Sequence, residues 1–128
     1  MSESIVRLKI SFQASDMKAV DLDKFTKDLL QEIKEQEVSS ASLISVAETP
    51  MGSEKASFGG FVLGALKTQV KTANLKGVLS YLRDKLTDQP IELEVESKGK
   101  RLILAANNQK DFYEAMEKAQ KFVEDNEK

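Results

Sequence analysis

The side chains best suited to chemistry in this sequence are the carboxylates of Glu92, Glu94 and Glu96, which alternate with apolar residues. Paired carboxylates can act as a general acid and base, or they can bind a hard cation. Acid–base chemistry needs two carboxylates in different environments, whereas these three are equivalent neighbours on one predicted strand. Arg101, together with Arg7 and Lys9 of the first predicted strand, can neutralise them. We therefore interpret them as a solvated sheet face, with an enzyme or small-ligand site as the alternative.

Serine hydroxyls are the other candidate nucleophiles. The 128-residue chain has no His, Cys or Trp, so it has no imidazole base, no thiol and no nitrogen or sulfur ligand for zinc or an iron–sulfur cluster. A Ser–Lys pair formed by Ser53 or Ser57 with Lys55 would need a buried lysine in a predicted loop. The sequence therefore predicts no catalytic residue, no cofactor and no metal.

An apolar, glycine-rich segment over residues 58–66 resembles a phosphate-binding loop only superficially. Such a loop needs a Lys-Ser or Lys-Thr pair directly after its last glycine, whereas Ala65 follows Gly64. We predict a helix over residues 58–72, although its three glycines disfavour one. On that helix Gly60 and Gly64, four residues apart, would allow close approach to a neighbour, either internal or on a partner. The segment is too short to span a bilayer.

Basic residues gather after this segment: Lys67, Lys71, Lys76, Arg83 and Lys85. In the predicted helix Lys67 and Lys71 lie one turn apart. The patch could dock an acidic partner, an anionic lipid surface or nucleic acid, or it could be the outer faces of two exposed helices. The whole chain has a net charge of −2, which makes nucleic acid an unexpected partner.

The elements that position these residues follow from hydrophobic periodicity. Val6, Leu8, Ile10 and Phe12 alternate with polar residues and predict a half-buried strand. The predicted elements are strands over residues 4–12, 42–47, 91–96 and 101–105, and helices over residues 21–37, 58–72, 74–88 and 108–124, with Asp21, Asn74 and Asn108 as N-caps and a frayed tail. This order predicts one α+β domain over residues 1–128, a four-stranded mixed sheet with helices packed mainly on one face.

Lys98 and Gly99 predict a two-residue hairpin turn between the last two strands. In that register Val95 faces Leu102, and Glu96 faces Arg101. Ile103 falls among the glutamates in the same register. It is therefore either a contact point on the surface or a residue that another element covers.

Several segments, covering most of the chain, carry a family resemblance: residues 6–11, 21–23, 58–66, 75–83 and 91–95, the Lys98-Gly99 turn and the helix around Asp111-Phe112. In this order they resemble the bacterial effector-associated constant component family. Tyr81-Leu82-Arg83 departs from the family pattern, where many relatives carry a tryptophan, and Lys67 and Lys71 interrupt a usually more apolar stretch. The resemblance implies a small, non-enzymatic adaptor of bacterial conflict (anti-phage or immunity-like) systems, which binds a separately encoded effector.

We therefore expect an adaptor or regulatory protein that binds a protein effector, with self-association left open. The alternative is a peripheral membrane-surface module, in which residues 58–66 enter the interface and the adjacent lysines bind head groups. The N-terminus lacks the pattern of a signal peptide, so we expect a cytoplasmic protein. The partner-binding candidates are Phe58, Gly60, Phe61, Leu63, Gly64, Lys67 and Lys71.

Overall fold

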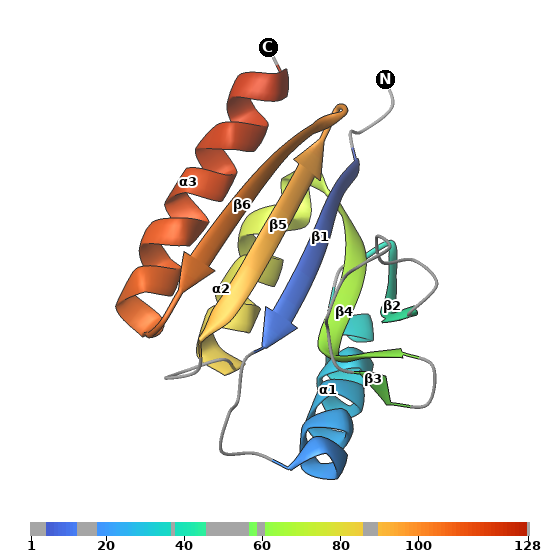
Figure 1. Ribbon diagram of the computed structural model, residues 1–128. Helices are drawn as coiled ribbons and strands as arrows, with labels where there is room; N and C mark the ends of the chain where they lie inside the picture. Colours follow the sequence, from blue (N-terminus) through green and yellow to red (C-terminus); the bar gives the residue numbers. More distant parts are fainter. Residues whose placement is uncertain are drawn as a thin grey trace.

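The computed structural model describes residues 5–12, 18–36, 38–45, 57–58, 61–85 and 90–127. Within them the chain is α+β, as predicted (Figure 1). The elements are β1 (Ile5–Phe12), α1 (Ala19–Lys34), β2 (Ser40–Ser45), β3 (Ser57–Phe58), β4 (Phe61–Lys71), the 3-10 turn η2 (Thr72–Asn74), α2 (Leu75–Lys85), β5 (Ile91–Ser97), β6 (Lys100–Ala106) and α3 (Gln109–Glu127).

The sheet has the strand order β2-β4-β1-β5-β6, and the two-residue β3 pairs with β4. Every strand pair among the described residues is antiparallel, so the predicted four-stranded mixed sheet is wrong in strand number and in direction. β4 lies between β1 and β2, and β1 lies between β4 and β5. The β1-α1-β2 unit is therefore split by β4, and the β4-α2-β5 unit is split by β1. This split β-α-β arrangement is that of the ferredoxin-like architecture. β6 and α3 extend this core at one edge.

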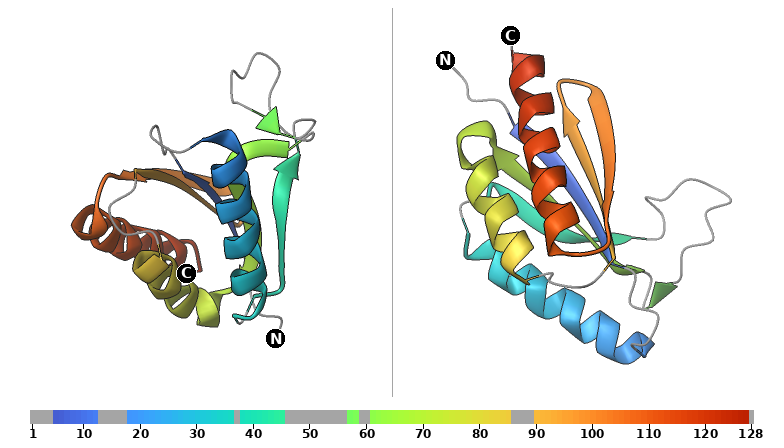
Figure 2. Two further views of the ribbon diagram at one scale, coloured as in Figure 1. Left: turned by 90° about the horizontal axis from the view of Figure 1, so that it is seen from below. Right: turned by 90° about the vertical axis from the view of Figure 1, so that its left-hand side faces the viewer.

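The three helices lie on the same face of the sheet (Figures 1 and 2). In β1, Val6, Leu8 and Ile10 are fully buried, as their alternation predicted. They belong to one apolar core with Leu79 of α2 and Phe112 of α3. Since an antiparallel sheet needs only one buried face, the alternate side chains of each strand remain on the side away from the helices.

The largest correction concerns β4, because the predicted helix over residues 58–72 is wrong. Leu66 and Val70 are buried while Lys71 is exposed, which is the period of a strand. Gly64 has φ +70°, a left-handed conformation that glycine adopts without strain. β4 pairs with β1 on one side and with β2 on the other. The hydrogen bonds of these two pairings make the segment the second strand from one edge of the sheet.

The β5–β6 hairpin agrees with its prediction. Val95 pairs with Leu102 and Glu96 pairs with Arg101, as expected from a two-residue turn. Lys98 and Gly99 both have positive φ, at 51° and 81°, as a type I′ turn requires. This turn therefore sets the register of the whole hairpin.

The helix boundaries were predicted less well at α1 than at α3. Lys18, not Asp21, is the N-cap of α1, and α1 ends at Lys34. Asn108 caps α3 as predicted, because its Oδ1 accepts a 2.8 Å hydrogen bond from the backbone N–H of Asp111. α3 continues to Glu127, beyond the expected frayed end. The predicted core residues Val46 and Leu86 lie outside the described residues.

A polar cluster joins α1 to α2 on the helix side of the molecule. The Tyr81 hydroxyl donates a 2.7 Å hydrogen bond to Glu32 Oε2, and Lys85 Nζ lies 3.3 Å from the same oxygen. The hydrogen bond from Tyr81, followed by the one from Lys85, holds the pKa of Glu32 below its ordinary value. Burial, and then the contact with the Glu32 carboxylate, raises the pKa of Tyr81.

We expect Tyr81→Phe to destabilise the protein at neutral pH and to matter less in acid. The carboxyl of Glu32 has a lower pKa in the folded protein than in the unfolded chain. It therefore stabilises the fold at pH values above its unfolded pKa, and this stabilisation is lost as the pH falls through its folded pKa. Urea unfolding of wild type and variant at neutral and acidic pH measures the difference. Tyr113→Phe, at an exposed tyrosine of α3, is the control and should show no such pH dependence. A Tyr81→Phe effect of equal size at both pH values would contradict the prediction.

Candidate functional site

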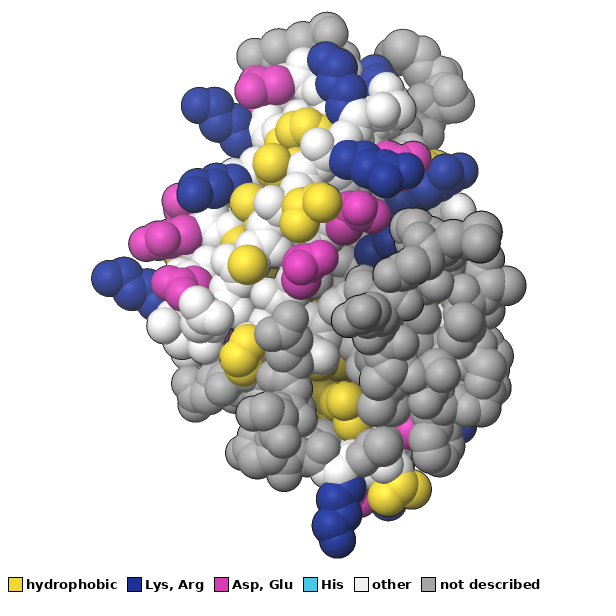
Figure 3. Space-filling model, in the orientation of Figure 1, with side chains coloured by type: hydrophobic (Ala, Val, Ile, Leu, Met, Phe, Trp, Pro, Cys, Tyr) yellow, Lys and Arg dark blue, Asp and Glu magenta, His cyan; other side chains and the backbone are white. Residues whose placement is uncertain are grey.

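One face of the sheet is not covered by any described helix (Figures 1 and 2), and we call it the open face. Figure 3 shows the molecule from this side. Its side chains alternate with the core residues along the strands: Ser40 and Ser42 of β2; Lys67, Gln69 and Lys71 of β4; Ile5, Arg7, Lys9 and Ser11 of β1; Glu92, Glu94 and Glu96 of β5; and Arg101, Ile103 and Ala105 of β6. Basic residues therefore lie on β4 and β1, acidic residues on β5, and both charge and apolar surface on β6.

Two cross-strand rows form the centre of the open face. In the first row Ser42, Lys67, Lys9 and Glu94 are direct neighbours on β2, β4, β1 and β5. Lys9 Nζ lies 3.6 Å from Glu94 Oε2. Two ammonium groups thus stand on adjacent strands, an arrangement that is repulsive by itself. The Glu94 carboxylate beside Lys9 offsets part of that repulsion.

In the second row Ser40, Gln69, Arg7, Glu96 and Arg101 are neighbours. The Glu96 carboxylate lies between two guanidinium groups, with Oε1 3.4 Å from Arg7 Nη1 and Oε2 3.6 Å from Arg101 Nε. Both arginine side chains are more than half exposed. Such exposed pairs add about 0–1 kcal/mol to stability, so the row orders the side chains more than it stabilises the fold.

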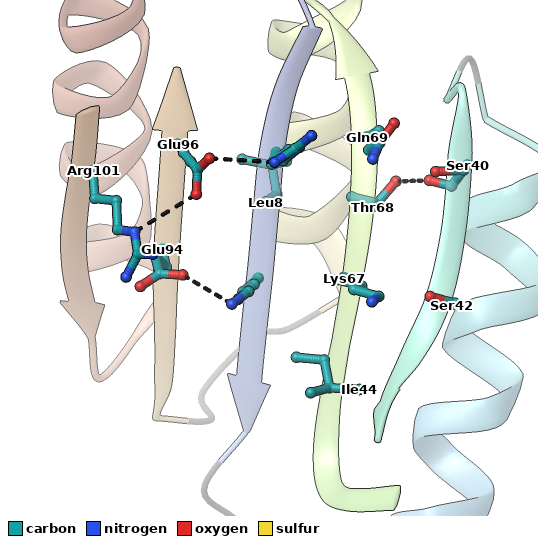
Figure 4. A pocket seen from close by; sticks show the side chains of 12 residues that line it. Leu8, Ser40, Ser42, Ile44, Lys67, Thr68, Gln69, Glu94, Glu96 and Arg101 are labelled. Carbon is teal, nitrogen blue, oxygen red and sulfur yellow. Dashed lines mark hydrogen bonds and ion pairs between the residues drawn. The ribbon is translucent and has the colours of Figure 1, made fainter. Parts of the chain in front are cut away.

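These rows surround a shallow hollow of about 440 Å³ on the open face (Figure 4). Four basic and two acidic side chains line it, so the hollow is net positive in a chain that is net negative. The lining residues are Arg7, Leu8, Lys9, Ser40, Ser42, Ile44, Lys67, Thr68, Gln69, Glu94, Glu96 and Arg101. The hydroxyl of buried Thr68 donates a 2.6 Å hydrogen bond to the Ser40 carbonyl oxygen, which ties β4 to β2 beside the hollow.

The arrangement suits binding better than catalysis. The Glu94 and Glu96 carboxylates each lie beside basic side chains, and the two face the same solvent-accessible hollow. They do not form a pair in contrasting environments, which acid–base chemistry would need. Within the part of the chain that the structure describes, no group of three or more acidic side chains could hold a metal ion.

The predicted partner-binding residues are distributed over β3 and β4. Phe58 lies in β3, and Phe61 and Leu63 lie in β4; the side chains of these three residues are outside the described part of the structure. Gly60, Ser53 and Lys55 lie outside the described residues. The premise that Gly60 and Gly64 share a helix face is wrong, because Gly64 lies in the strand β4.

The structure also divides the predicted basic patch. Lys67 and Lys71 lie on the open face, two strand positions apart on either side of Gln69, and not one helical turn apart. The remaining three basic residues belong to α2, on the opposite side of the sheet. There Lys85 pairs with Glu32, and Arg83 Nε lies 3.3 Å from Asp84 Oδ1.

Sequence reasoning did not identify Ser40, Ser42 and Gln69 as neighbours of the lysines. Their assembly depends on β4 lying between β1 and β2, which local pattern does not reveal. One signal was present: residues 66–71 alternate apolar or small with long polar side chains, the period of a strand. That alternation would have placed Lys67, Gln69 and Lys71 on one face.

The chain was compared with protein-family models, with curated proteins and with solved structures, and none of the three comparisons gave a match. Among the described residues, no helix combines the length and the apolar character needed to cross a bilayer. In the segment over residues 58–66, which the membrane-surface alternative invokes, the described residues are strand and not the predicted helix.

Proposed function

We propose that this chain is a non-enzymatic adaptor that docks a separate protein on the open face of its sheet. The observation that supports this most is the hollow at the centre of that face, which four basic and two acidic side chains line. Three ion pairs join Arg7, Lys9 and Arg101 to the two glutamates, and Lys67 lies beside Lys9 on the neighbouring strand. A surface with fixed charges of both signs can select one partner by matching its charges.

A protein fits this surface better than nucleic acid does. Single-stranded nucleic acid is bound through aromatic stacking platforms, and the described side chains of the open face include none. The column formed by Glu92, Glu94 and Glu96 would repel phosphates along the full length of β5. We infer that the partner places carboxylates over Arg7, Lys9 and Lys67.

The resemblance to the effector-associated constant component family suggests what kind of protein this partner is. In such a conflict system the partner is a separately encoded effector, and this chain positions or restrains it. The ferredoxin-like architecture supplies a rigid platform for that role but does not by itself imply it.

The test is capture of the partner by tagged protein in the native host, quantified by mass spectrometry. We expect Lys9→Gln/Lys67→Gln to reduce recovery of a stoichiometric partner by about tenfold or more, because both charges lie at the centre of the proposed interface. The matched control is Lys24→Gln/Lys118→Gln, which makes the same charge change at exposed positions of α1 and α3. It should recover the partner as wild type does.

Cross-linking of the captured complex then locates the contact. Cross-links from Lys9 and Lys67 to the partner would support docking on the open face. Equal recovery by both double variants, or cross-links confined to the helices, would contradict it. Circular dichroism of each variant confirms that the fold is retained.

A further inference from the structure

We propose a second interaction surface, at the outer edge of β6, which pairs in antiparallel fashion with β6 of a second copy of this chain. β6 is the last strand of the sheet, with β5 on its inner side and no described strand on its outer side. Figure 2 (right) looks toward this edge, and β6 lies there uncovered beside α3. The inference is independent of the open-face docking site.

The hairpin turn decides which backbone groups point outward from β6. After a two-residue turn, the flanking residues Ser97 and Lys100 form a hydrogen-bonded pair. Hydrogen-bonded and non-hydrogen-bonded pairs then alternate along an antiparallel ladder. Arg101, Ile103 and Ala105 therefore direct their N–H and C=O groups away from β5. These groups are available to another strand.

The side chains of β6 lack the usual protection of an edge strand. Natural edges avoid pairing through charges, proline, bulges or short length. β6 pairs with β5 without a bulge over all seven residues, and its charges are confined to Lys100 and Arg101. Ile103 is 59% exposed on the open face. Leu102 and Leu104 are only half-buried on the helix side.

One register of the two β6 strands pairs their outward backbone groups and brings their apolar side chains together. A two-fold axis at Ile103, the central residue of β6, pairs the whole strand with its copy. Ile103 then meets the second copy's Ile103, and Leu102 meets the second copy's Leu104. Arg101 faces the second copy's Ala105, so no like charges are opposed. The pairing would cover part of the exposed side chain of Ile103.

Sedimentation from micromolar to near-millimolar concentration tests the dimer. We expect the wild-type mass to rise from monomer to dimer. Ile103→Lys should remain a monomer, because two ammonium groups would face each other on the axis while each copy keeps its own β5 pairing. Val20→Lys is the matched control, since Val20 of α1 is also 59% exposed, and it should dimerise as wild type does. Thermal unfolding verifies that both variants are folded.

Single-cysteine variants, Ile103→Cys and Ala105→Cys, test the register, because the chain has no cysteine of its own. Across the proposed axis the two thiols introduced at position 103 would be direct neighbours, within disulfide reach, whereas the two introduced at position 105 would be roughly 14 Å apart. We expect Ile103→Cys to form a covalent dimer on oxidation and Ala105→Cys to remain monomeric. A wild type that stays monomeric, a dimer unaffected by Ile103→Lys, or faster cross-linking at position 105 would each overturn the proposal.

Discussion

Gly64→Ala is expected to lower the free energy of unfolding by about 2 kcal/mol, because position 64 has φ +70° and its neighbours would have to shift to admit a Cβ. A Cβ there would lie 3.2 Å from Leu22 Cδ2 and 3.2 Å from the Phe12 carbonyl oxygen. The carbonyl belongs to the end of β1, so relief of the contact would disturb the pairing that places β4 in the sheet. Urea unfolding measures the change.

Gly77→Ala is the matched control for this prediction. Gly77 lies in α2 with ordinary negative φ, and a Cβ there would meet no atom within 4 Å. Alanine should therefore stabilise the protein by about 0.5–1 kcal/mol, since glycine disfavours a helix interior. If Gly64→Ala lowers the free energy of unfolding and Gly77→Ala raises it, backbone strain at position 64 is distinguished from a general effect of the added methyl group. A neutral Gly64→Ala would contradict the left-handed conformation.

Phe112→Ala is expected to produce the largest loss of stability, about 3–5 kcal/mol. Phe112 is 2% exposed and anchors α3 in the core beneath the sheet. Removal of its ring would leave a cavity between α3 and the strands. Thermal and urea unfolding should show a lower midpoint, and the circular dichroism signal of the helices should be lost in the same transition.

Tyr113→Ala is the control at the adjacent position of α3. Tyr113 is 50% exposed, and its ring centroid lies 5.9 Å from the Arg83 guanidinium carbon. Loss of an exposed cation–π contact costs about 0.5–1 kcal/mol, well below the effect at Phe112. Comparable losses at both positions would show that α3 is not anchored through Phe112.

Where interacting residues are close in sequence, the fold could be predicted from the sequence. The β5–β6 hairpin is the clearest case, because alternation defines both strands and Lys98-Gly99 defines the register between them. The cap at Asn108 is equally local, since its side chain bonds to Asp111 three residues later. One prediction over a long sequence distance is also confirmed: Arg7 Nη1 lies 3.4 Å from Glu96 Oε1 and Lys9 Nζ lies 3.6 Å from Glu94 Oε2, so the first strand neutralises these glutamates.

Only the tertiary structure decided the position of β4, and with it the candidate site. Thr68 pairs with Leu8 on one side and Ala41 on the other, partners that lie far away along the chain. Local periodicity carries no information about which strands such a segment joins, and the prediction of a helix over residues 58–72 overlooked the strand-like alternation of residues 66–71. The sequence by itself determined the alternation of β1 and β5, the β5–β6 hairpin and the absence of imidazole and thiol side chains. Which strands became neighbours, and therefore which charges share the open face, depended on burying the apolar side chains of β1, β4 and β5 against the helices in the main core.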